Sequence, residues 1–68
     1  MTKSEFIATV KLLGLKHMHD DIYMCDNPVI YINIINWGSG YKVDVDNGIY
    51  GINKALELII KRCQNKNS

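Results

Sequence analysis

The sequence predicts an α+β fold with the order helix, three-stranded antiparallel sheet, helix, and with both helices on one face of the sheet. Apolar residues recur at helical spacing only near the two ends of the chain, at 3–13 and 52–63. Between them lie three runs rich in β-branched and aromatic residues, at 22–25, 29–37 and 41–46. Two strong turn signals, Asp26-Asn27-Pro28 and Gly38-Ser39-Gly40, separate these runs.

Length and composition limit the classes of protein that are possible. The chain has 68 residues, 47% hydrophobic and 22% charged, so we expect a single globular domain over residues 1–68 that frays at 65–68. There is no run of 18 apolar residues and no signal-peptide pattern at the N-terminus, which indicates a cytoplasmic protein without a membrane partner. A net charge of +1 gives little attraction for phosphates and disfavours a nucleic-acid partner. Cys25 and Cys63 are expected to be reduced thiols.

The first helix is predicted from its start signal and its apolar spacing. Thr2 followed by Glu5 forms a capping box, in which each side chain bonds a backbone N–H of the other residue. Gly14 can adopt the left-handed conformation that ends a helix. The apolar positions of this helix are Phe6, Ile7, Val10 and Leu13. The segment 15–21 could extend the helix or begin a strand, and we expect it to be a connection.

The run from Val29 to Trp37 is the strongest strand prediction, because it alternates with a period of two. One of its faces carries Ile30, Ile32 and Ile34, and the other carries Val29, Tyr31, Asn33, Ile35 and Trp37. Neither face is wholly polar, so we expect each face to pack against another part of the protein or a partner. The strands on either side are Ile22–Cys25, which alternates weakly, and Tyr41–Asp46, whose inward positions are Tyr41, Val43 and Val45.

The second helix is predicted to follow a short lead-in at 49–51, with Gly51 as its cap. Lys61 and Arg62 near its end would interact favourably with the negative pole of the helix dipole. Its apolar face comprises Ile52, Ala55, Leu56, Ile59, Ile60 and Cys63.

No group of residues indicates catalysis or a cofactor. His17 and His19, with Asp20, Asp21 and Cys25 nearby, have the residue types of a zinc site, but no spacing places a third or fourth ligand. The alternative is two solvent-facing histidines, and we assign no metal. Gly38-x-Gly40 lies between two strands and so lacks the helix N-terminus of a phosphate loop. We therefore expect a protein that is not an enzyme and binds no cofactor.

Two helices can cover one side of a three-stranded sheet, so the other side is predicted to be a binding surface. The alternative is that the first helix or the segment 15–21 covers these residues as core, or that Trp37 lies at the end of the sheet, outside any site. The partner-binding residues predicted on this basis are Tyr23, Tyr31, Asn33, Ile35, Trp37, Lys42 and Asp44.

The element order resembles that of the double-stranded-RNA-binding domain over nearly the whole chain. That family grips phosphates with a lysine cluster at the start of its second helix. Here the corresponding stretch, Gly51 to Ala55, supplies a single lysine, Lys54. A nucleic-acid module would use the aromatic residues for stacking and Lys42, Lys54, Lys61 and Arg62 for phosphates.

The same order, with Tyr41–Val45 leading through an Asn-Gly turn into an amphipathic last helix, resembles small phage-encoded inhibitors of bacterial immunity, including type II anti-CRISPR proteins. The resemblance implies a phage or mobile-element protein of a bacterial host that blocks a larger protein or complex by covering its surface. Two further possibilities remain open: a homodimer formed through the aromatic face, and a dimer that sequesters a small ligand.

Overall fold

The computed structural model describes residues 1–26 and 28–64. Its elements are α1 (Lys3–Leu12), β1 (Lys16–His19), β2 (Ile22–Asp26), β3 (Val29–Trp37), β4 (Gly40–Val45), β5 (Gly48–Tyr50) and α2 (Ile52–Gln64). The strands form one antiparallel sheet in the order β1-β2-β3-β4-β5, so each strand pairs with its neighbours along the chain. Asn27 of the first expected turn and the expected fraying at 65–68 lie outside the described residues.

The prediction of a three-stranded sheet is wrong, because the sheet has five strands. The first missed strand is β1, in the segment that was expected to be a connection. All four of its residues are exposed, so it lacks the apolar alternation that marks a half-buried strand. It is held by backbone pairing with β2 across a tight turn in which Asp20 takes a φ of 50°.

The second missed strand is β5, which was expected to lead into the last helix. Asp46 and Asn47 both take positive φ, 50° and 73°, and Val45 pairs with Gly48 directly across them. Two successive residues with positive φ form the two-residue turn that suits the twist of a hairpin. The Asn-Gly signal therefore marks a hairpin that returns the chain along β4, and β5 is only three residues long.

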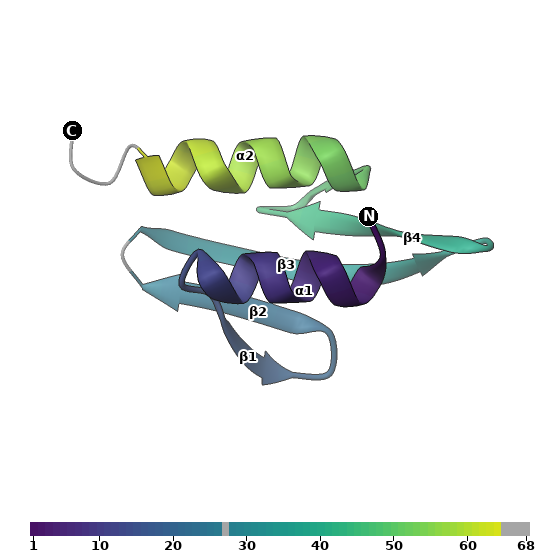
Figure 1. The fold of residues 1–68 in the computed structure, drawn as a ribbon, viewed down its shortest axis with the longest axis horizontal. Helices are drawn as coiled ribbons and strands as arrows, with labels where there is room; N and C mark the ends of the chain where they lie inside the picture. The colour runs from purple at the N-terminus through teal and green to yellow at the C-terminus, as the bar shows by residue number, and fades with distance from the viewer. Residues whose placement is uncertain (27, 65–68) are drawn as a thin grey trace.

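Both helices pack on the same face of the sheet, where they close a single core (Figure 1). Phe6 and Val10 of α1 and Ala55 and Ile59 of α2 are fully buried. The buried sheet residues are Tyr23, Ile30, Ile32, Ile34, Val43 and Val45. Arg62 attaches the last turn of α2 to the sheet, since it donates to the carbonyl of Val29 and forms an ion pair with Asp46. The opposite face of the sheet is left without a helix in the described part of the chain.

The predicted capping box is present at the start of α1. The Thr2 hydroxyl accepts the Glu5 N–H at 3.1 Å, and the Glu5 carboxylate accepts the Thr2 N–H at 2.8 Å. These bonds to Thr2 hold the pKa of the Glu5 carboxyl below its ordinary value of 4.5. Gly14, just beyond the helix, takes a φ of 108°, as a helix-ending glycine does.

Replacing Glu5 with glutamine tests the charged half of the capping box. Glutamine keeps an oxygen that can accept the Thr2 N–H, so the variant removes the ionisation alone. Because the folded-state pKa of Glu5 is lowered, its ionised form stabilises the fold above about pH 4.5, and this contribution is lost as the pH falls through the lowered value. We expect wild type to be more stable than the variant at pH 7 and the gap to close on acidification. Melting temperatures across pH 2–7 measure it, and a gap that does not change with pH contradicts the interpretation.

Candidate functional site

The face of the sheet opposite the helices is the candidate functional site, and we call it the open face. Residues paired across neighbouring strands share a face, so the register assigns its members. Its central row comes from β3, and the other strands contribute on either side. The open face comprises Lys16, Met18 and His19 of β1, Ile22, Met24 and Asp26 of β2, Val29, Tyr31, Asn33, Ile35 and Trp37 of β3, Lys42 and Asp44 of β4, and Ile49 of β5.

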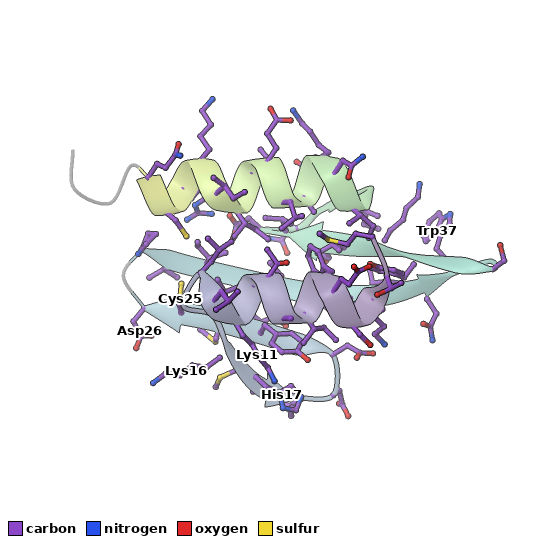
Figure 2. All side chains as sticks on the ribbon, viewed as in Figure 1. Lys11, Lys16, His17, Cys25, Asp26 and Trp37 are labelled. Carbon is purple, nitrogen blue, oxygen red and sulfur yellow. The ribbon has the colours of Figure 1, made fainter. Side chains whose placement is uncertain are left out.

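Two aromatic residues stand out from this face. Trp37 is 51% exposed and Tyr31 is 40% exposed, although both belong to the central strand of the sheet. Trp37 lies towards the tip of the β3–β4 hairpin, at the other end of the sheet from Cys25 and Asp26 (Figure 2). The Lys42 ammonium lies 4.8 Å from the centre of the Trp37 ring, a cation–π contact that keeps this ring on the open face.

The other predicted site residues lie around these aromatic residues. Asn33 pairs with Asp44, and Ile35 pairs with Lys42, so these four side chains form two adjacent rows across β3 and β4. All four are half-buried. The Asp44 carboxylate also accepts the N–H of Asn47 at 3.0 Å, which fixes its position at the β4–β5 turn. The structure therefore brings six of the seven predicted residues onto one surface.

The placement of Tyr23 on this surface is wrong. Tyr23 is 5% exposed and pairs with Ile32, which places it in the core beneath the helices. Its ring centre lies 5.1 Å from that of His17. The run Ile22 to Cys25 is apolar at every position, so its sequence does not reveal which residues face inward. The pairing with β3 determines which residues face the core, and it places Ile22 and Met24 on the open face.

The open face is wider than the sequence indicated. Lys16, Met18 and Ile49 belong to β1 and β5, the two strands that were not predicted, and so they were not considered as site residues. A signal for them was present. Asp20-Asp21 and Asp46-Asn47 each form a two-residue connection of turn-forming residues, and hairpins at both points would have predicted the outer strands.

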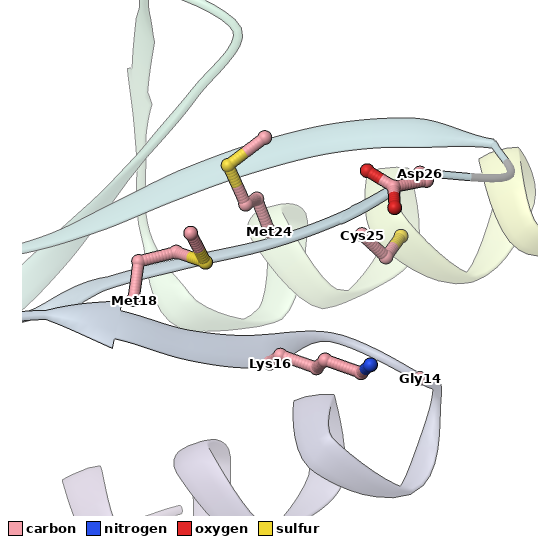
Figure 3. Close-up of a pocket in the computed structure, with 6 residues that line it drawn as sticks. All are labelled: Gly14, Lys16, Met18, Met24, Cys25 and Asp26. Carbon is pink, nitrogen blue, oxygen red and sulfur yellow. The ribbon is translucent and has the colours of Figure 1, made fainter.

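A cavity of about 290 Å³ lies at the β1–β2 side of the open face. Figure 3 shows Met18 and Met24 on neighbouring strands and Lys16 further along β1, with Cys25 and Asp26 at the end of β2. Gly14 completes the lining. Cavities that hold small-molecule ligands usually measure about 300–1,000 Å³. This cavity is at the lower end of that range.

The candidate nucleophile Cys25 forms a local hydrogen bond, and the candidate metal ligands His17 and His19 lie apart. The Cys25 thiol donates to the carbonyl of Pro28 at 3.0 Å, and burial raises the pKa of this thiol, which disfavours the reactive thiolate. His17 pairs with Tyr23 and His19 pairs with Ile22 across a bulge, so the two histidines lie on opposite faces of β1. Within residues 1–26 and 28–64, no group of three or more His, Cys, Asp or Glu side chains could hold a metal ion.

The cations that a nucleic-acid interface would need are dispersed. Lys42 lies on the open face, whereas Lys54 and Lys61 belong to α2, which packs against the other face of the sheet. Arg62 is engaged by Asp46 and by the carbonyl of Val29. These four residues therefore do not form one basic patch of the kind that phosphate binding uses.

Comparison with protein-family models, with curated proteins and with solved structures finds no match to this chain. The helix–three-strand–helix order that carried both resemblances does not occur, because the sheet has two further strands. Over the described residues, α1 and α2 are both too short and too polar to cross a lipid bilayer. The open face, with its exposed Tyr31 and Trp37, is thus the candidate binding surface.

Proposed function

We propose that this chain is a non-enzymatic protein-binding module that covers a protein surface with its open face. One observation carries the proposal: Tyr31 and Trp37 protrude from the central strand on the side of the sheet opposite α1 and α2. Exposed apolar patches bounded by polar groups are typical of interaction sites. Here the apolar centre is bounded by Lys16, Lys42 and Asp44.

The composition of the face fits what protein interfaces use to gain affinity. Most binding energy comes from a few desolvated aromatic or arginine residues, surrounded by contacts that exclude water. Tyr31 and Trp37 would be the anchors, and the half-buried Ile35 lies on the same strand between them. Because the face is built on paired strands, binding would need little ordering of the backbone, which lowers the entropic cost of association.

In its finer form, the proposal is that the chain inhibits a larger protein or complex of a bacterial host by occlusion. Two features behind the resemblance to phage-encoded inhibitors of bacterial immunity, the small size of the chain and its amphipathic last helix, support this form. A protein of this kind needs an adhesive surface and no catalytic groups. The open face would supply that surface.

Site-specific photo-crosslinking tests the proposal. A benzophenone amino acid replaces Ile35 at the centre of the open face, and in a matched variant it replaces Glu57, which is exposed on α2. We expect light to join the position-35 variant to a discrete protein, either a second copy of the chain or another bacterial protein, and the position-57 variant to none. The adduct should disappear when Trp37 is also replaced by alanine. Equal labelling at both positions, or none at position 35, contradicts the proposal.

A further inference from the structure

We propose that a second copy of this chain covers the open face when no other partner is present, in a two-fold sandwich of two sheets whose axis runs along β3. This inference rests on the proposed function, since it names the protein that the face binds first. It is supported by the symmetry of the face itself, by the position of its charges and by a contact between its outer strands.

The centre of the face can pair with itself. β3 is the middle strand of five, so an axis along it sets Tyr31, Asn33 and Ile35 against the same residues of the second copy. An interface of this symmetry is formed by one patch that is complementary to itself. The Asn33 side chain carries both a hydrogen-bond donor and an acceptor, so two such amides can bond each other reciprocally. The neighbouring side chains of Tyr31 and Ile35 can pack against the same side chains of the second copy, because apolar contacts need no donor or acceptor of opposite kind.

One pair of charges favours this axis over an axis that crosses the strands at Asn33. Lys16 lies on β1, at one side of β3, and Asp44 lies on β4, at the other side. Rotation about β3 exchanges the two sides, which brings Lys16 of each copy within reach of Asp44 of the other. An axis across the strands at Asn33 would instead set Asp44 against Asp44, which repels. Within the described residues, neither Lys16 nor Asp44 takes part in an ion pair of its own chain.

The outer strands provide a second contact. Ile49 lies on β5 in the row that runs through Asp44, Asn33 and Ile22 to His19 on β1. The same rotation therefore carries Ile49 over His19 of the second copy, next to Met18 at the edge of the cavity. Ile49 is 50% exposed, so it is free to make this contact. An aliphatic side chain against the Met18 thioether is a favourable apolar contact.

The size of the face suits a weak dimer. Strands lie about 4.8 Å apart and residues rise about 3.3 Å along a strand, so the face is about 20 Å wide and at most about 30 Å long. Because the outer strands are shorter, two such faces would bury about 1,000–1,200 Å² in total, at the lower end of specific interfaces. We expect the dimer to dissociate in the micromolar range, so that a better-matched protein could displace the second copy.

Charge reversal on the open face tests the geometry. Lys16→Glu should weaken the dimer about tenfold, because each dimer contains the Lys16–Asp44 contact twice and the variant makes both contacts repulsive. The double variant Lys16→Glu with Asp44→Lys should restore the dimerisation constant to within about threefold of wild type. Lys61→Glu changes the net charge equally but lies on α2, so it should have no effect. Sedimentation equilibrium from about 1 µM to 1 mM measures all four proteins, and circular dichroism checks their folds.

The outcomes separate this inference from the proposed function. A wild-type chain that stays monomeric throughout overturns the dimer, and so does a dimer that responds equally to Lys16→Glu and Lys61→Glu. If a monomeric chain nevertheless gives Trp37-dependent crosslinks from position 35 to another protein, the proposed function stands without the dimer. The absence of both the dimer and the crosslinks overturns both.

Discussion

Replacing Ile59 with alanine is expected to lower the free energy of unfolding by about 2–5 kcal/mol. Ile59 is fully buried on the inner face of α2, where it belongs to the core that both helices share with the sheet. Removing three carbons there loses the transfer energy of the side chain and leaves a cavity that the surrounding strands cannot fill. A domain of this size is stable by only a few kcal/mol, so much of the variant should be unfolded at 25 °C.

The adjacent residue supplies a matched control. Ile60 has the same side chain on the same helix, but it is 38% exposed. Its replacement with alanine should cost clearly less than Ile59→Ala, because more than a third of the residue already faces water and alanine is the better helix former. Urea denaturation, monitored by circular dichroism, compares the two variants with wild type. Equal losses would show that α2 does not pack as described.

The elements that the sequence predicted well are those stabilised by local interactions or by a long pattern. The capping box of Thr2 and Glu5 lies within one helical turn, and α1 begins where it indicates. β3 has the predicted bounds, Val29–Trp37, because nine alternating residues outweigh any local ambiguity. The inward positions of β4, including the buried Val43 and Val45, follow from the same period of two.

The missed elements owe their structure to pairing with distant residues. β1 and β5 have four and three residues, too few to show a period, and most of their side chains are exposed or half-buried. Such strands form because a neighbouring strand offers hydrogen bonds, which composition does not encode. The same limit misplaced Tyr23, because a strand that is apolar throughout gains its orientation from the partner strand. The central residues of the open face were thus predicted, and those at its two sides were missed.

Tyr31 and Tyr23 carry the same side chain on neighbouring strands, but their replacement with alanine is expected to cost very different amounts of stability. Tyr31→Ala removes a ring that is 40% exposed, so its effect on stability should stay within about 1 kcal/mol. Tyr23→Ala removes a ring that is 5% exposed and belongs to the core, and it should cost about 3–5 kcal/mol and unfold much of the chain. Thermal denaturation distinguishes the two, and the comparison decides which face of the sheet is core.

Association, unlike stability, is expected to depend strongly on Tyr31 and Trp37. Tyr31→Ala and Trp37→Ala are each expected to weaken binding through the open face by about 2 kcal/mol or more, roughly 30-fold, because aromatic anchors dominate interfaces of this kind. The measurement is the yield of position-35 crosslinks and the dimerisation constant of each folded variant. Replacing Leu12, which is 89% exposed on α1, with alanine removes a similar apolar area outside the face and should leave both unchanged. If Tyr31→Ala and Trp37→Ala instead unfold the chain, these rings serve stability; if they stay folded and associate like wild type, the open face is not the binding surface.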